Sequence, residues 1–426
     1  MTSLRAQSVD RLLSVALAGI IAGVVTLISS VSYAALMFSG QLSPFISAGV
    51  AALVSTAVIA GGLFSLLSGC RPLVAMPDDD TAPVLALMGT LIVASFPADT
   101  PPEVLFFAVF VALTFAALAT GLMLAALGVF KLGSLVRYLP YSVMGGYFAG
   151  AGLLLIQGAL RVVTDLPLVS AADFLQLLDM ELLMRWLPAV GAAGLISLAV
   201  ARLHETLAMP VIMFVMVAAF YLLAMLSGWS PSELMADKWL VGPFPESRPS
   251  LVNPVLIERA GEIDWVLIYD HLSSIGTIVM LSAVSLMLTA SGLSVLQREN
   301  IDINRELQVS GLANTVSGLT GGLVCLPSMT LTELASKVGA PPSRLVGLSV
   351  AGFCGLMLLF GMSLIAWFPK AILAGLLIFL GLSLLKRWLI DARTQLPRLE
   401  YVVVVIIVLV VAAIGFLEGV MVGLLC

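Results

Sequence analysis

The feature that most constrains the fold of this chain is a short pattern that occurs twice. Residues 73–77 read Leu-Val-Ala-Met-Pro, and residues 323–327 read Leu-Val-Cys-Leu-Pro, 250 residues further on (327 − 77). Glycine precedes each copy, and polar residues follow it. A short extended run that ends in proline and leads into a helix predicts a helix that begins inside a membrane, where protein or a water-filled cavity must cover the unpaired backbone. Two such breaks at corresponding positions of two halves indicate the binding site of a transporter.

The composition indicates a membrane protein throughout. Of the 426 residues, 60% are hydrophobic and 11% are charged, whereas soluble domains have about 25% charged residues. Apolar runs of about 20 residues, each long enough to cross a hydrocarbon core, recur from end to end. We therefore predict an all-α polytopic membrane protein.

Hydropathy divides the chain into two halves of seven spans each. Residues 1–228 form the first half, 229–262 a polar loop outside the membrane, and 263–426 the second half. The last span begins near residue 416, too close to Cys426 for a full crossing, so we expect the second half to be incomplete. The predicted spans lie near 12–37, 45–68, 79–95, 104–130, 141–163, 184–202 and 207–228, then 263–293, 305–322, 328–338, 343–367, 371–386, 399–413 and 416 onward.

The basic residues predict the orientation. With the N-terminus in the cytoplasm, 14 of the 20 Lys and Arg residues fall on the cytoplasmic side, as the positive-inside rule requires. Seven spans in each half place the halves in opposite orientations, so the repeat is inverted. The six basic residues left outside are Arg161, Arg185, Lys238, Arg248, Arg259 and Lys370.

In this topology the helices that begin after Pro77 and Pro327 point their N-termini at each other near the middle of the membrane. Each N-terminus exposes unpaired N–H groups and about half a positive charge. Two opposed N-termini predict an anion site made by the backbone at 79–81 and 328–330.

Several stretches resemble the sulfate permease (SulP) family of anion transporters and exchangers, which includes prestin and pendrin. The most specific are residues 139–150 (LPYSVMGGYFAG), 301–307 (IDINREL) with 311–314 (GLAN), and 369–377 (PKAILAGLL). The resemblance implies seven-plus-seven inverted repeats, a core domain and a gate domain, alternating access and a homodimer. It also implies a cytoplasmic STAS domain after the last span, which this sequence does not contain.

The sequence departs from the family pattern at positions that bear on the substrate. Ser29 stands where many members have Gln, and Ser285 and Ser294 stand where several coupled members have a carboxylate. Leu331 falls where some members have Arg. Residues 78–80 are three aspartates, at a helix start that the family uses for an anion.

The aspartates have two interpretations. Aspartate at a helix start can simply cap the helix, but ionisable groups at membrane depth are costly and usually mark a pathway or an ion site. If two or more are ionised they repel an anion, so either they bind protons that enter with the anion or the solute is a cation or a zwitterion. Serines near the site likewise serve either packing or binding, and the Gly-rich run 146–150 is interpreted as helix packing.

We predict a secondary active transporter, a symporter or antiporter, of a small anion such as sulfate, bicarbonate, chloride or a carboxylate. The alternatives are a transporter of a cationic or zwitterionic solute such as a basic amino acid, and a membrane motor or scaffold without transport. No nucleophile–base pair or metal-binding spacing is recognisable, so we expect neither an enzyme nor a cofactor. We expect an integral protein of a bacterial inner or plasma membrane. The predicted substrate-binding residues, with Asp79 and Asp80 also coupling protons, are Ser29, Tyr33, Asp79, Asp80, Thr81, Ser285, Thr289, Ser328, Met329 and Thr330.

Overall fold

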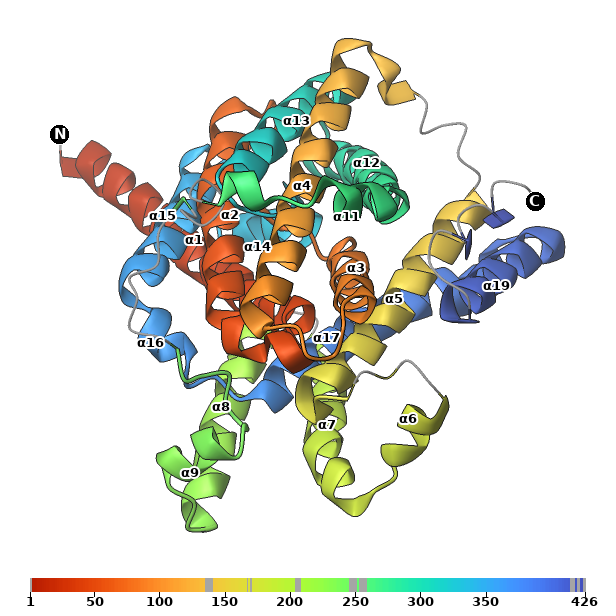
Figure 1. The fold of residues 1–426 in the computed structure, drawn as a ribbon. Coiled ribbons are helices and arrows are strands. Elements are labelled where there is room, and N and C mark those ends of the chain that lie inside the picture. Colours follow the sequence, from red (N-terminus) through yellow and green to blue (C-terminus); the bar gives the residue numbers. More distant parts are fainter. Residues whose placement is uncertain are drawn as a thin grey trace.

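The computed structural model shows a bundle of helices that surrounds one short two-stranded sheet (Figure 1). The residues that the structure describes are 2–134, 141–166, 168, 171–203, 208–244, 251–252, 259–413, 418–419 and 422–423.

The elements of the first half follow the predicted spans closely. They are α1 (Thr2–Met37), η1 (Gly40–Phe45), α2 (Ile46–Leu67), β1 (Ala75–Pro77), α3 (Ala82–Ser95), α4 (Pro102–Val129), α5 (Tyr141–Thr164), α6 (Ala171–Gln176), α7 (Met180–Leu203), α8 (Ala208–Leu226) and α9 (Pro231–Ala236). Those of the second half are η3 (Ala260–Glu262), α11 (Trp265–Asp270), α12 (Leu272–Gln297), α13 (Ile303–Leu319), β2 (Cys325–Pro327), α14 (Met329–Lys337), α15 (Leu345–Phe360), α16 (Met362–Ile365), α17 (Lys370–Leu385), η4 (Lys386–Ile390), α18 (Ala392–Gln395) and α19 (Arg398–Ala413).

Some of the predicted segments are divided further in the structure. The polar loop 229–262 contains the short helix α9, because Ser230 and Glu233 form a capping box at its start. The span predicted at 263–293 is divided at His271 into α11 and α12, and Asp264 caps α11 by accepting the backbone N–H of Val266 at 2.9 Å. The predicted last span lies largely outside the described residues.

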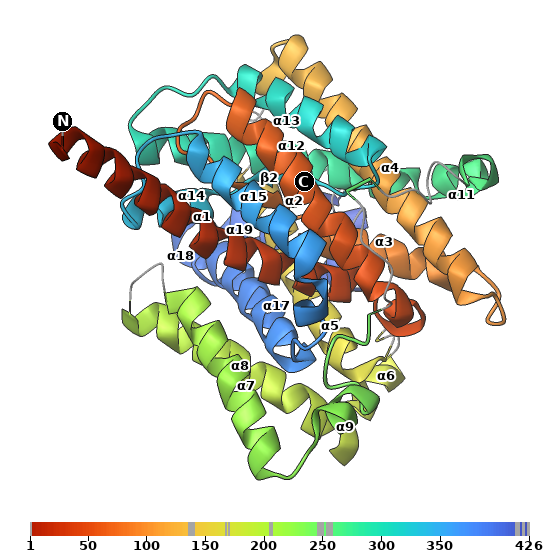
Figure 2. The same ribbon diagram turned by 90° about the vertical axis from the view of Figure 1, so that its left-hand side faces the viewer.

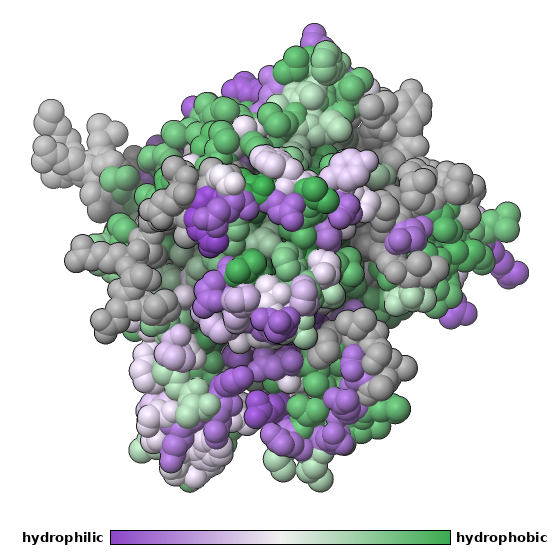
Figure 3. All heavy atoms as spheres, in the orientation of Figure 1, coloured by the Kyte–Doolittle hydropathy of each residue, from purple (hydrophilic) through white to green (hydrophobic). Residues whose placement is uncertain are grey.

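The outer surface is suited to lipid. Hydrophobic side chains cover wide areas of the face shown in Figure 3. Met225 on α8 and Phe360 on α15 are 79% and 78% exposed. Large exposed apolar areas are unfavourable in water and are typical of a surface that contacts lipid or another protein. Eight helices among the described residues are long and apolar enough to cross a membrane. The structure is therefore that of a polytopic membrane protein.

Corresponding helices of the two halves pack in corresponding ways. Helix α4 lies along α13, and α2 lies along α15, so that each half lends one helix to each pair (Figure 2). Helix α5 likewise packs against both α17 and α19, while α17 packs against α5 and α7. The α4–α13 contact is close, because a Cβ on Gly121 would lie 2.3 Å from the backbone nitrogen of Thr315.

The two broken segments meet at the sheet. Strands β1 and β2 are antiparallel, with Met76 opposite Leu326. The backbone N–H of Asp78 donates to the carbonyl of Val324 at 3.1 Å, and that of Ser328 donates to the carbonyl of Val74 at 2.9 Å. The predicted helix breaks are thus confirmed, and each segment satisfies part of the other's backbone.

Polar side chains of neighbouring helices satisfy the remaining backbone groups. The side chain of Asn314 on α13 accepts the N–H of Cys325 and donates to its carbonyl, both at 2.8 Å. The hydroxyl of Thr56 on α2 accepts the N–H of Leu323 at 2.7 Å, and that of Thr332 on α14 accepts the N–H of Val74 at 3.1 Å. Extended backbone is therefore tolerated here because protein covers it.

The stretch from 301 to 314, part of the family resemblance, has structural roles that the fold explains. Asp302 caps α13, accepting the N–H of Asn304 at 3.0 Å. The buried carboxylate of Glu306 accepts the Ser68 hydroxyl at 2.8 Å and the Gly69 N–H at 2.9 Å, which ties the end of α2 to α13.

Replacing Asn314 by leucine is expected to destabilise the protein, because the N–H and carbonyl of Cys325 both lose their partner. Each buried unsatisfied group costs about 1–3 kcal/mol. We expect a lower thermal unfolding midpoint for the purified protein in detergent. The matched control is Thr315→Val, because the Thr315 hydroxyl bonds only within its own helix, to the carbonyl of Gly311. Equal midpoints for the two variants would contradict this role of Asn314.

Candidate functional site

The loops that follow β1 and β2 open into one cavity of about 240 Å³. Helices α3 and α14 begin at this cavity, and α12, α5 and the π-helical turn η4 complete its wall. The lining residues are Asp78, Asp79, Asp80, Phe148, Ser285, Leu288, Thr289, Pro327, Ser328, Met329, Thr330, Leu384, Arg387 and Trp388.

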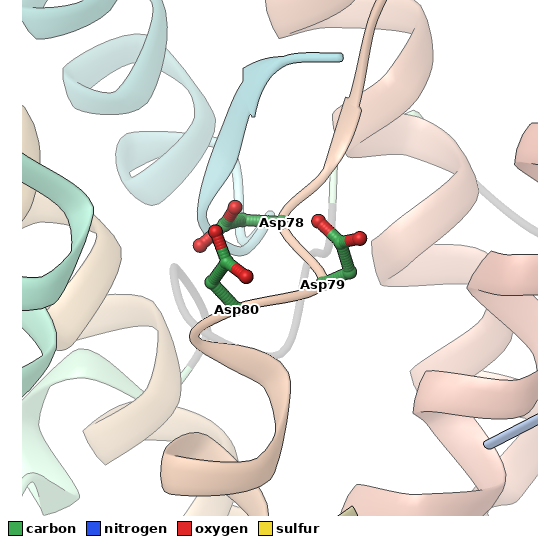
Figure 4. A group of neighbouring side chains, drawn as sticks. All are labelled: Asp78, Asp79 and Asp80. Atoms are coloured by element: carbon green, nitrogen blue, oxygen red, sulfur yellow. The ribbon is translucent and has the colours of Figure 1, made fainter. Parts of the chain in front are cut away.

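The three aspartates lie on the turn between β1 and α3, and Asp79 points away from Asp78 and Asp80 (Figure 4). Each offers a carboxylate oxygen within 4.8 Å of those of the other two. Asp78 is buried, Asp80 is partly buried and Asp79 is exposed. Because the three residues are consecutive, three acidic groups lie on one wall of the cavity.

Asp78 caps the turn that leads into α3, and helix capping is one of the two interpretations that the sequence offers for the aspartates. Its Oδ2 accepts the backbone N–H of Thr81 at 3.0 Å and the Thr81 hydroxyl at 2.6 Å. The residue 250 positions later, Ser328, caps α14 in the same way: its Oγ accepts the N–H of Leu331 at 3.3 Å. The two half-helices thus begin with corresponding caps, one acidic and one neutral.

Asp80 contacts the second half of the chain. The hydroxyl of Ser285 on α12 donates a short hydrogen bond to Asp80 Oδ2. Arg387, on η4, lines the same cavity. Asp80 therefore has a neutral donor in Ser285 and shares the cavity with a cation, while Asp79 is exposed.

The opposite wall combines aromatic rings with a cation. Phe148 of α5 and Trp388 of η4 stack with ring centroids 5.1 Å apart. The guanidinium of Arg387 lies 5.3 Å from the centre of the Trp388 ring. Arg387 is the basic residue among those that line the cavity, and it faces the three aspartates there.

Most of the predicted site residues meet at this cavity. Those that line it are Asp79, Asp80, Ser285, Thr289, Ser328, Met329 and Thr330. Ser29, Tyr33 and Thr81 do not line it: all three are buried, and the Thr81 hydroxyl is occupied by Asp78. Tyr33 and Ser29 both lie on α1, one helical turn apart.

Sequence reasoning missed the aromatic and basic wall. The run 146–150 was interpreted as packing, and Gly146 and Gly150 do pack against α19, where a Cβ on Gly146 would lie 2.6 Å from Ile407. Phe148, between them, lines the cavity instead. The orientation predicted from the basic residues places Arg387 in the cytoplasm, and no role is predicted for the adjacent Trp388. Both lie in the π-helical turn η4, a feature often found at functional sites, but that turn is visible only in the structure.

Similar proteins are membrane transporters. A yeast relative from Saccharomyces cerevisiae, the vacuolar basic amino acid transporter VSB1, is 24% identical over 381 residues, which cover 88% of this chain and 36% of VSB1. The bicarbonate transporter BicA of Synechocystis is 26% identical (86% of this chain, 63% of BicA), and a probable sulfate transporter of Mycobacterium tuberculosis, MT1781, is 25% identical (84% and 61%). The chain thus spans between about a third and two thirds of the length of these relatives.

Solved structures share the fold. The transmembrane domain of a cyanobacterial bicarbonate transporter BicA superposes with a TM-score of 0.71 at 22% identity, over 96% of this chain and 97% of that one. SLC26A9 superposes with a TM-score of 0.76 at 16% identity, over 97% of this chain and 64% of that one. Residues 12–407 match the sequence pattern of the sulfate permease family. The chain therefore belongs to the sulfate permease family.

Proposed function

We propose that the chain is a secondary active transporter that moves a small anion by alternating access and takes up protons on Asp79 and Asp80 with it. The observation that supports this most is the single cavity at which both half-helices begin, because a helix N-terminus presents N–H groups and a partial positive charge to an anion. Membership of the family and the names of the sulfate and bicarbonate relatives agree with an anionic substrate.

The donors for the anion come from the α14 side of the cavity. Ser328 and Thr330 lie at the start of α14 and carry hydroxyl groups as well as backbone N–H groups, and Arg387 adds a full positive charge. Charge-assisted hydrogen bonds from such groups are about twice as strong as neutral ones.

Proton uptake follows from the charges of the lining. Three carboxylates and one guanidinium give the lining a net charge of −2 when all are ionised. Charges a few ångströms apart in a partly buried cavity repel by several kcal/mol, so an anion binds well only after the aspartates have taken up protons. Symport of the anion with protons satisfies this requirement.

A second candidate is transport of a cationic or zwitterionic solute such as a basic amino acid. The same three carboxylates would then be the counter-charge for the cation, and the stacked rings of Phe148 and Trp388 would offer aromatic faces that attract it. The yeast relative is named a basic amino acid transporter. In a zwitterion the carboxylate would face Ser328 and the cation would face Asp79.

We also propose how the chain is arranged in its membrane. Residues 1–228 and 263–426 form two inverted halves joined by the loop 229–262, with the N-terminus in the cytoplasm. The equivalent pairing of α4 with α13 and of α2 with α15 supports the division into halves. The protein is expected to be a homodimer.

The aspartate variants Asp79→Asn and Asp80→Asn separate the two candidates. Removing the negative charge should favour binding of an anionic solute and weaken binding of a cationic one. We expect uptake of labelled sulfate or bicarbonate into proteoliposomes to continue in the variants and to lose its increase at acidic pH, since Asn resembles a protonated aspartate. Uptake of labelled arginine, if it is the substrate, should fall at least about ten-fold, as expected when a cation loses a charge-assisted partner.

The control for this panel is Asp264→Asn, which removes a carboxylate that caps α11 away from the cavity. Anion uptake that keeps its full pH dependence in both aspartate variants would contradict proton coupling through these residues. Arginine uptake by the wild type that the variants abolish would establish the second candidate in place of the first.

The double variant Ser328→Ala, Thr330→Ala is expected to raise the KM for the transported solute about ten-fold, because two hydroxyl donors of the cavity are removed. The maximal rate at saturating solute should change less. The matched control is Ser336→Ala, further along α14, whose hydroxyl bonds only to the carbonyl of Thr332 in its own helix. An unchanged KM in the double variant would remove these residues from the site.

A further inference from the structure

A second cavity, of about 440 Å³, lies at the other end of α3. The C-terminal half of α3, the end of α1, η1 and the end of α5 form its wall. Thr90 in this wall is ten residues beyond Asp80, which corresponds to about 15 Å along a helix. The two cavities share no lining residue. The second cavity is therefore separate from the aspartate site.

The wall of this cavity contains a cation that the proposed transport site does not use. Arg161, near the end of α5, donates a hydrogen bond from Nη1 to the hydroxyl of Thr90 at 2.6 Å. Among the described residues no carboxylate forms an ion pair with Arg161. The acidic residue of the wall, Asp165, is paired with Lys238 at 3.8 Å. The guanidinium of Arg161 thus remains the uncompensated charge of this cavity.

A partly buried guanidinium without a carboxylate partner is costly to desolvate, so an anion that supplies the missing negative charge would bind there favourably. Thr90 uses one of five N–H donors, so the planar guanidinium can still bind an acceptor with two oxygens. Ser39 and Gln41 add polar groups to a wall that is otherwise largely apolar. A few placed polar groups in an apolar pocket of this size are typical of a small-molecule site.

We propose that the second cavity binds a small oxyanion or carboxylate through Arg161, at a site separate from the aspartate cavity. The charges of the two cavities support different occupants: the aspartate cavity is acidic, whereas this one is positive once Asp165 is paired with Lys238. In the orientation proposed above, the end of α3 faces the outer side, where a transported anion enters or leaves. The binding itself does not depend on that orientation or on the proposed transport.

The test is equilibrium binding of radiolabelled sulfate to the purified full chain in non-ionic detergent. We expect Arg161→Gln to weaken binding at least about ten-fold, the effect of losing a charge-assisted hydrogen bond, although glutamine can still bond to Thr90. Arg161→Lys should bind sulfate more tightly than Arg161→Gln because it keeps the charge, and less tightly than the wild type because an ammonium group cannot reproduce the planar two-oxygen contact. Arg161-dependent binding should persist in the Ser328→Ala, Thr330→Ala background, which alters the other cavity.

Thr90→Val distinguishes a binding site from a simple link between α5 and α3. This variant removes the hydrogen bond and leaves the charge, so sulfate affinity should stay within about two-fold of the wild type. A loss in Thr90→Val as large as that in Arg161→Gln would overturn the proposal, as would wild-type affinity in Arg161→Gln or no sulfate binding by the wild type.

A second measurement uses only the wild-type protein, in case Arg161→Gln does not fold. Phenylglyoxal modifies accessible arginine guanidinium groups, and mass spectrometry locates the modified residue. We expect sulfate to slow the modification of Arg161 while leaving that of Arg259, which is paired with Glu262, unchanged. Equal rates with and without sulfate at Arg161 would contradict the proposal.

Discussion

The hydrogen bonds between β1 and β2 hold the rest of the structure in place. A helix satisfies its own backbone, but the residues before Pro77 and Pro327 cannot, and each unsatisfied group in a membrane interior costs several kcal/mol. The two segments solve this by pairing with each other, and Asn314, Thr56 and Thr332 complete the set. Because the strands are antiparallel, α3 and α14 leave the pair in opposite senses and begin close together. The cavity at the two helix starts is a direct consequence of that pairing.

The repeat is symmetric in backbone and asymmetric in charge. Asp78 and Ser328 occupy corresponding positions and cap their helices in corresponding ways. The next two positions are Asp79 and Asp80 on one side, and Met329 and Thr330 on the other. Backbone geometry alone would give two equivalent ends suited to an anion, and the aspartates make one end acidic. In the proposed function this asymmetry is the reason that the solute must be accompanied by protons or be a cation, and it is a property of side chains that could change without altering the fold.

Local sequence patterns were enough to predict the fold and the cavity at which the two broken segments meet. The paired Gly–Pro breaks and the apolar spans are local patterns. The breaks depend on backbone hydrogen bonding and the spans on hydrophobicity, and both can be recognised from neighbouring residues in the sequence. The capping by Asp78 and Ser328 was predictable for the same reason. The resemblance to the sulfate permease family, based on stretches such as 301–307, is confirmed by the match over residues 12–407.

What could not be predicted depends on how distant segments pack. Phe148 and Arg387 are 239 residues apart (387 − 148) and line one cavity only because α5 lies against α17 and η4. The bond between Ser285 and Asp80 likewise joins two halves. Ser29 and Tyr33 lie on α1, which contributes no residue to the lining of the cavity. Periodicity does not show which polar face of a buried helix meets a cavity, and both side chains are buried.

The central claim is that one solute binds between the starts of α3 and α14. A cryo-electron microscopy structure of the protein in lipid nanodiscs, with the solute that proteoliposomes transport present at saturation, tests it most directly. The account predicts ligand density between Asp79 or Asp80 and the Ser328–Thr330 turn, absent from a matched map without the solute. Density for that solute only elsewhere, with the space between the two helix starts unchanged, would contradict it.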